Sequence, residues 1–270
     1  MNHSRFLHLV AHRGNADEFP ENTLPAIASA LELGVRFIAV DVQVSANGIP
    51  MAMRDCDLAM LAGIAGDATQ MTAAELAQID VSEPQRFGDR FRGTGIPRLI
   101  DVLGLLGRRP EATAFIIIGR ASLIRIGHDQ VVAQVLETLK PYRSRCIFVS
   151  SDLPAIYRAR QMAGVPIGWI IGAYDQHTRL KCEALQPEYL FCDRMLLPVS
   201  GNLWRGPWRW VIQDVPALEH ALKLAERGAH FISTSRVRAM SEAMRAYAGA
   251  QPRNPNEIRN PDDTYPMATD

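Results

Sequence analysis

The stretch FIAVDVQV, residues 37–44, decides the fold of this 270-residue chain. It is almost entirely apolar and carries one carboxylate, Asp41, which is typical of a strand buried on both faces of a parallel sheet. The apolar run at residues 6–11 predicts an earlier buried strand. His12 and Arg13 follow that run directly. We therefore expect both side chains where the first strand ends.

Strands and helices alternate along most of the chain. Asn22 or Thr23 can cap a first helix, because apolar residues recur at helical spacing from Leu24 onward. Six further strands are predicted to begin at Ala114, Cys146, Ile167, Tyr189, Trp208 and His230. Helices are predicted between most of them, including one long helix over residues 122–140. Eight strands in this alternation predict a closed (β/α)8 barrel, the TIM barrel fold.

The length fits one such domain, since a single α/β barrel usually takes about 250 residues. We assign the barrel to residues 1–250 and expect a small insertion at residues 56–95 near the barrel mouth. Within it, Thr72 and Glu75 form a capping-box pattern that predicts a short helix. Residues 84–95 are predicted to be loop. Residues 251–270 are rich in Pro, Asn and Asp, which predicts a flexible tail.

Composition narrows the class of protein. Lys plus Arg and Asp plus Glu both number 29, so the formal charge is zero, which argues against a general nucleic-acid or membrane surface. The four cysteines lack Cys-x-x-Cys spacing and are predicted to be reduced and mostly buried. We find no signal-peptide pattern and no apolar run of about 18 residues. The expected location is therefore cytoplasmic, without a membrane span.

Several motifs occur in a fixed order: His12-Arg13-Gly14, the PENT stretch at residues 20–23, Asp41, Asn47-Gly48 and Asp55. This pattern resembles the glycerophosphodiester phosphodiesterase family of (β/α)8 barrels. The resemblance implies hydrolysis of diesters derived from glycerophospholipids, and hence a role in lipid metabolism. It also implies two Glu and one Asp that hold a divalent cation, and two His that act as acid and base.

The chain departs from this pattern at several positions. Ala39 stands where the family has the Glu of Glu-x-Asp, and Arg54 stands where it has the His of His-Asp. On the third barrel strand we align Ile118 with the Glu of Glu-x-Lys and Arg120 with its Lys. Of five catalytic positions, only His12 as acid or base and Asp41 as metal ligand remain.

These substitutions reverse the expected charge of the site. Asp41 is predicted to face Arg13, Arg54 and Arg120, whose guanidinium groups bind phosphate well. One carboxylate is a poor ligand set for calcium or magnesium, so no metal cofactor is expected. Arginine cannot shuttle protons near neutral pH. The sequence thus predicts a degenerate family member that binds a phosphate or phosphodiester with weak or no metal-dependent hydrolysis.

Two other functions stay open, so whether the chain is an enzyme is not decided by sequence. One is an active phosphodiesterase with a Mg or Ca site rebuilt from Glu21, Asp41, Asp55 or Asp57. The other is a non-catalytic interaction scaffold. The expected partner is a small phosphorylated molecule or a glycerophosphodiester, and not nucleic acid; the oligomeric state is not predicted.

Three side chains have a structural and a functional interpretation. Glu21 either sits in the first turn of a helix or pairs with Arg13 or Arg54 at a substrate site. Trp208 either packs in the core or lines a glycerol or head-group pocket. Gln213, at the end of the same predicted strand, is expected to point toward the mouth and contact substrate.

Overall fold

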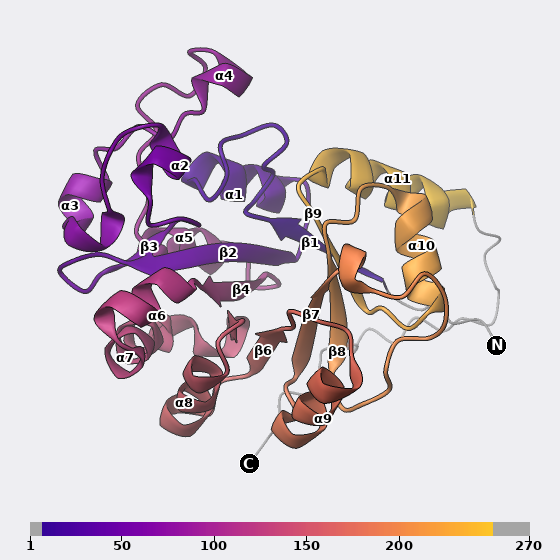
Figure 1. Cartoon of the computed structure of the whole chain (residues 1–270). Coiled ribbons are helices and arrows are strands. Elements are labelled where there is room, and N and C mark those ends of the chain that lie inside the picture. Colours follow the sequence, from indigo (N-terminus) through magenta and orange to yellow (C-terminus); the bar gives the residue numbers. More distant parts are fainter. Residues whose placement is uncertain (1–6, 251–270) are drawn as a thin grey trace.

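Eight parallel strands close into a barrel (Figure 1). The structure, a computed structural model, describes residues 7–250, so the predicted tail lies outside the described residues. β1 pairs with both β2 and β9, which closes the sheet and confirms the predicted fold. The barrel strands are β1 (His8–His12), β2 (Phe37–Val44), β4 (Thr113–Ile118), β5 (Cys146–Ser150), β6 (Ile167–Ile170), β7 (Tyr189–Asp193), β8 (Arg209–Gln213) and β9 (Phe231–Thr234). A short β3 (Pro50–Ala52) adds to β2 in antiparallel direction.

Helices cover the outside of the barrel. They are α1 (Leu24–Glu32), α5 (Leu99–Gly107), α6 (Arg120–Ile126), α7 (His128–Leu139), α8 (Leu153–Ala163), α9 (Gln176–Leu185), α10 (Leu218–Glu226) and α11 (Val237–Ala250), with 3-10 turns η2 (Lys140–Arg145) and η3 (Arg194–Leu196). The Thr23 hydroxyl caps α1 as predicted, by accepting from the Ala26 amide. The single helix predicted over residues 122–140 is wrong. Gly127, at φ +105°, separates α6 from α7.

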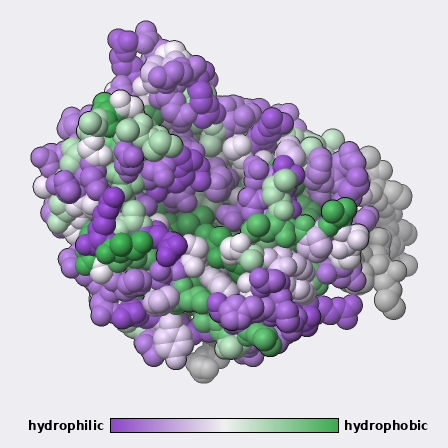
Figure 2. Space-filling view, in the orientation of Figure 1, coloured by the Kyte–Doolittle hydropathy of each residue, from purple (hydrophilic) through white to green (hydrophobic). Residues whose placement is uncertain are grey.

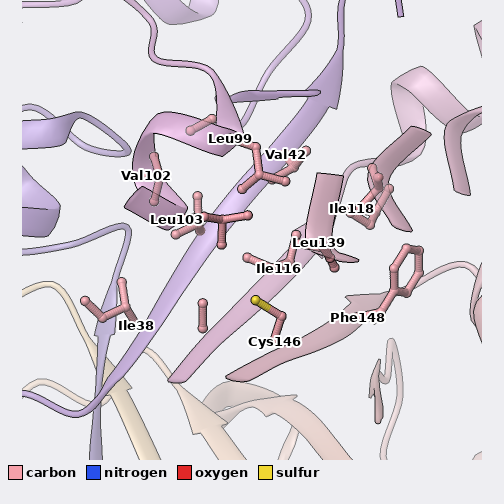
Figure 3. Close-up of a cluster of buried hydrophobic side chains, with 14 of the residues drawn as sticks. Ile38, Val42, Leu99, Val102, Leu103, Ile116, Ile118, Leu139, Cys146 and Phe148 are labelled. Atoms are coloured by element: carbon pink, nitrogen blue, oxygen red, sulfur yellow. The ribbon is translucent and has the colours of Figure 1, made fainter. Parts of the chain in front are cut away.

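Side chains alternate between the inside of the barrel and the helices. On β2, Phe37 and Ala39 pack inside with Phe115 and Ile117 of β4. Ile38, Val42, Ile116 and Ile118 pack outside, against α5 and α7 (Figure 3). Because Asp41 is an even number of residues from Ala39, its side chain faces the inside. It lies near the carboxyl ends of the strands, where barrels of this kind hold their active sites.

The insertion at residues 56–95 forms a small helical unit with its own core. It contains α2 (Leu58–Ala62), η1 (Ala68–Gln70), α3 (Ala73–Leu76) and α4 (Pro84–Phe87), so the loop predicted over residues 84–95 is wrong at its start. The capping box of Thr72 and Glu75 is confirmed at α3. The unit packs on β3 through Met51, Met53, Leu58, Leu76 and Ile96. Its α4 stands out from the body (Figure 1).

In the space-filling view of the same face, apolar surface gathers near the middle and polar surface dominates the edge, including the projecting segment (Figure 2). Within residues 7–250, no helix combines the length and apolar character needed to cross a membrane.

Candidate active site

The loop after β1 turns sharply and folds back on itself. Arg13 and Asn22 both adopt φ +59°, a left-handed conformation that is uncommon for residues other than glycine. The Arg13 amide donates to the Ala39 carbonyl of β2 at 2.8 Å, and the Asn22 amide donates to the Arg13 carbonyl at 3.0 Å. Gly14 has φ +81°, and a Cβ there would lie 2.5 Å from the carbonyl carbon of Ala26. The HRG and PENT motifs are therefore held together by backbone geometry.

The Arg13 side chain forms ion pairs with two carboxylates. Its Nε donates to Asp41 Oδ2 at 2.5 Å, and its Nη1 donates to Glu21 Oε2 at 2.8 Å. Asn22 also binds Asp41: its Oδ1 accepts from the Asp41 amide at 3.0 Å and its Nδ2 donates to Oδ2 at 3.4 Å. Burial opposes the charge of Arg13, but Asp41 and Glu21 more than offset it, so the pKa of Arg13 is raised. The guanidinium therefore stays charged.

Arg54 lies on the outer side of this network. Its Nε donates to Asp55 Oδ2 at 2.5 Å, and its Nη1 is 3.9 Å from Glu21 Oε1. Gln43 Nε2 donates to the Arg54 carbonyl at 2.8 Å, which fixes the backbone beside β2. The Arg54 side chain is 42% exposed, so solvent reaches part of it.

His12 is the last residue of β1 and is half-buried. Its Nδ1 has no hydrogen-bond partner among residues 7–250. Burial is the main cause that lowers the pKa of His12; Arg13 lowers it further, while Asp41, Glu21 and Asp214 act in the opposite direction. The imidazole is therefore neutral near pH 7 and can accept a proton.

Arg120 does not face Asp41, which corrects the prediction that three arginines surround that carboxylate. It is the first residue of α6, its side chain is 65% exposed, and its Nε lies 3.9 Å from Asp152. The alignment of Ile118 and Arg120 with the Glu and Lys of the family stays a prediction. Ile117, not Ile118, is level with Asp41 and faces the barrel interior, because strand side chains alternate. The inward-facing position of β4 beside Asp41 is therefore aliphatic.

Trp208 is far from His12 along the barrel axis, which corrects its assignment to substrate binding. It precedes the first residue of β8, so it lies at the amino end of the barrel, and it lines a cavity of about 540 Å³ with Trp204 and His230. Gln213 is the last residue of β8 and is level with Asp193 at the mouth. Its contact with substrate stays a prediction.

Sequence reasoning missed two polar partners. Asn22 was considered only as a helix cap, yet it binds Asp41. His128, the first residue of α7, contacts Asp152 Oδ1 through Nε2 at 3.0 Å at the carboxyl end of β5. Asp152 also caps α8 by accepting from Ala155. Its position just before Leu153-Pro154 is a capping signal in the sequence, but nothing there indicated His128.

The residues at the mouth do not fit a divalent cation. Asp41 and Glu21 are both engaged with Arg13, and Asp55 is engaged with Arg54. Asp57 is used at the start of α2, where it accepts from the Ala59 amide. Within the described part of the chain, no three His, Cys, Asp or Glu side chains gather as a metal site. Calcium takes about six to eight oxygen ligands and magnesium about six, with carboxylates supplying the negative charge, and here the carboxylates at the mouth are already paired with arginines.

Known proteins share this fold and part of this sequence. A solved phosphodiesterase of Oleispira antarctica, in complex with the product sn-glycerol-3-phosphate, superposes with a TM-score of 0.77 over 90% of this chain and 98% of that one, at 20% identity. A glycerophosphodiester phosphodiesterase of Caldanaerobacter subterraneus subsp. tengcongensis is 33% identical over 99 residues, which are 37% of this chain and 40% of that protein. An uncharacterised protein of Mycobacterium tuberculosis is 37% identical over 114 residues, 40% of this chain and 37% of that protein.

The matched stretches span about two fifths of these two relatives, so their sequence likeness concerns a part of each protein. The model of the glycerophosphoryl diester phosphodiesterase family matches residues 12–200, from the histidine at the end of β1 to beyond β7. With the closed barrel and the His12-Arg13-Gly14 motif at its mouth, this match shows that the chain belongs to the glycerophosphoryl diester phosphodiesterase family.

Proposed function

We propose that this chain binds a phosphate ester or phosphodiester at the barrel mouth without a divalent cation, and that it hydrolyses glycerophosphodiesters weakly or not at all. One observation carries the proposal: Arg13 engages both Asp41 and Glu21 at 2.5 and 2.8 Å. The positive charge at this site is a guanidinium of the protein itself.

Arg54 and Arg13 are the phosphate ligands in this proposal. Arg54 is partly exposed and its ion pair with Asp55 is near the surface. Exposed pairs of this kind contribute only about 0–1 kcal/mol, so a phosphate can compete for the guanidinium. Arg13 has five N–H groups and uses Nε and Nη1 on carboxylates. The glycerol phosphate in the Oleispira antarctica protein supports a small phosphorylated ligand for this fold.

The two arginines are matched by Glu21, Asp41 and Asp55, so the sequence prediction of a strongly positive pocket needs revision. Two positive and three negative side chains sum to −1 with His12 neutral. The proposed recognition therefore depends on directed hydrogen bonds from the guanidiniums rather than on a general positive field. We therefore expect the affinity for phosphate to fall as the salt concentration rises, because salt screens charges near the surface.

Hydrolysis is expected to be weak because the described residues place one imidazole, that of His12, at this corner, while Glu21, Asp41 and Asp55 are engaged with arginines. His12 is neutral and can act as a base, but Arg54 occupies the position expected of its partner and keeps its proton. Loss of one acid or base lowers a rate by about 10²- to 10⁴-fold, and loss of a cation removes several kcal/mol of charge stabilisation.

Calorimetric titration with sn-glycerol-3-phosphate in the presence of EDTA tests the binding. We expect saturable binding by the unmodified chain, at least tenfold weaker binding by Arg54→Ala, and no change in Arg120→Ala, which removes an exposed arginine from another part of the rim. Equal loss in both variants, or no binding at all, would contradict the proposal.

A parallel assay follows release of choline from glycerophosphocholine with calcium or magnesium present. The proposal predicts turnover far below the about 1–10³ s⁻¹ of ordinary enzymes. Ordinary rates together with stoichiometric metal at micromolar affinity would instead establish an active enzyme with a rebuilt metal site.

Residence in the cytoplasm remains part of the proposal. All four cysteines are free and buried, as expected of a protein from a reducing compartment. Fractionation of the producing cells, with the chain detected by antibody, tests it.

A further inference from the structure

The connection from β7 to β8 leaves a cavity at the amino end of the barrel, away from the mouth. Within residues 7–250, this is the crossover between parallel strands that contains no α-helix, only the 3-10 turn η3. A helix normally covers the outside of each strand in such a barrel. Here the irregular segment 197–208 packs on β8 instead, through Leu203 and Trp204. A cavity of about 540 Å³ remains between this segment and the end of α10, which is a size typical of ligand pockets.

The walls of this cavity are aromatic. Three of the four tryptophans of the chain line it: Trp204, Trp208 and Trp210. Trp208 and Trp210 are buried, whereas Trp204 is half-buried and stacks on Tyr174 with ring centroids 3.9 Å apart. The Trp204 amide donates to the Tyr174 hydroxyl at 3.1 Å, and its carbonyl accepts from Trp210 Nε1 at 2.9 Å. The indole of Trp204 is therefore a fixed apolar surface that is partly exposed.

Several hydrogen-bond donors beside these walls are unused. Trp208 is 3% exposed, and its Nε1 has no partner among residues 7–250. Arg205 is exposed and forms no ion pair or hydrogen bond with another described residue. Arg227 donates from Nε to the Gly201 carbonyl and from Nη2 to the Pro198 carbonyl, so its Nη1 is not used. Since buried donors normally have a partner, a ligand that suits this cavity offers oxygen acceptors.

The charges at the cavity favour a ligand with one negative group. Burial is the main cause that lowers the pKa of His230, and Arg209 lowers it further, so the imidazole is neutral near pH 7. Its Nδ1 accepts from a backbone amide at 3.1 Å, so the ring proton is on Nε2 and can be donated. The positive side chains of Arg205 and Arg227 and the negative side chain of Glu226 then sum to +1.

The cavity also offers acceptors, in the carboxylate of Glu226 and the amide oxygen of Asn202. A sugar has hydroxyl groups that donate to such oxygens and accept from indole and guanidinium N–H groups. The C–H face of a sugar ring can lie on the apolar face of Trp204. An aromatic acid could stack on the same indole, but it has no hydroxyl groups for Glu226 and Asn202.

We propose that this cavity is a second binding site, which takes a monosaccharide unit carrying one negative group, such as a uronic acid. The site lies at the end of the barrel opposite to His12, so it does not depend on the function proposed for the mouth.

Tryptophan fluorescence tests the site directly, because three of the four tryptophans line it. Glucuronate is titrated beside glucose, which lacks the negative charge, and benzoate, which lacks the hydroxyl groups. We expect glucuronate to change the fluorescence saturably, with a dissociation constant of about 1 mM or less, and both other probes to bind at least tenfold more weakly. Benzoate or glucose binding as tightly as glucuronate would overturn the proposed ligand class, and failure of glucuronate to saturate at about 10 mM would overturn the site.

Variants then locate the binding, which is measured by calorimetry. Arg205→Ala should weaken glucuronate binding about tenfold or more, because it removes a charge-assisted hydrogen bond, and Arg205→Lys should restore part of it. Two variants at the mouth, Arg54→Ala and Arg120→Ala, should bind glucuronate like the unmodified chain. Arg205 is exposed, so Arg205→Ala should also keep the melting temperature of the unmodified chain.

The outcomes separate this site from the mouth. Unchanged glucuronate binding in Arg205→Ala, or its loss in Arg54→Ala, would show that the sugar binds elsewhere and would contradict the proposal. Glycerol phosphate binding should be the same in Arg205→Ala as in the unmodified chain. Absence of glycerol phosphate binding in every variant would contradict the function proposed for the mouth and leave the aromatic cavity standing.

Discussion

Two corners of the barrel mouth use the same kinds of side chain in different ways. The β1–β2 corner contains His12, Arg13, Glu21, Asp41 and Arg54. The β4–β5 corner contains Arg120, His128 and Asp152. In the first corner the arginine side chain that binds Asp41 is 17% exposed and the N–O distance is 2.5 Å. In the second, the arginine is 65% exposed and its nearest carboxylate oxygen is at 3.9 Å.

The difference teaches that burial and connectivity, rather than residue type, give a charged side chain its role. Arg13 is held by two carboxylates and by its own backbone, so it acts as a structural charge of the site. Arg120 begins a helix and extends into solvent, so its pair with Asp152 contributes little. A family alignment alone would give the two arginines similar weight.

The largest expected effect concerns the two carboxylates. Asp41→Asn leaves Arg13 with one partner in a shielded site, and such losses typically cost about 3–5 kcal/mol. Asp152→Asn keeps a side chain that can still cap α8, so we expect a loss of about 1 kcal/mol or less. Equilibrium unfolding in urea measures both values. Equal losses would remove the contrast between the corners.

The second-largest contrast is expected between alanine substitutions of Gly14, after β1, and Gly127, after α6. Gly14→Ala places a Cβ 2.5 Å from the backbone of Ala26 at φ +81°, whereas Gly127→Ala, at φ +105°, meets nothing within 4 Å. We expect Gly14→Ala to lower the free energy of unfolding by about 3 kcal/mol or more, because backbone strain is combined with a clash. Gly127→Ala should lower it by about 1–2 kcal/mol, because it introduces strain alone. Urea unfolding of both variants checks this order, and a larger loss for Gly127→Ala would contradict it.

The pH dependence of stability should carry a contribution from His12. Its pKa in the folded chain is lowered, first by burial, so the unfolded chain binds the proton more readily. The contribution of His12 to the free energy of unfolding is therefore complete above the pKa of the unfolded chain, about 6.5. It is lost as the pH falls through the pKa of the folded chain, with a slope of at most about 1.4 kcal/mol per pH unit. His12→Asn should flatten this slope in urea titrations below pH 6.5. An unchanged slope would show that His12 is protonated equally in both states.

The smallest effect belongs to the exposed arginine. Arg120→Ala should change the free energy of unfolding by no more than about 0.5 kcal/mol, since its pair is long and solvated. Glycerol phosphate affinity should be unchanged as well. A loss of more than tenfold in affinity would restore Arg120 to the binding site and revise the comparison.

Local patterns predicted the barrel well for identifiable reasons. The apolar run at residues 37–44 became β2 with the same bounds, because a strand buried on both faces has a distinctive sequence. Thr23 and Thr72 cap the helices assigned to them. The helix predicted over residues 122–140 failed at Gly127, since apolar spacing continues across a break that only the backbone angle reveals. Which β4 residue faces the barrel interior beside Asp41 could not be predicted, because a continuous apolar strand shows no alternation.

The sequence by itself determined the architecture: eight buried strands, with the His12-Arg13-Gly14 motif at the end of the first. Only the tertiary structure decided which charges meet. Arg13 binds Asp41 and Glu21, while Arg120 extends away toward Asp152. Strand and helix patterns depend on neighbours along the chain, but ion pairs depend on distances between residues far apart in it, which only the closed barrel sets.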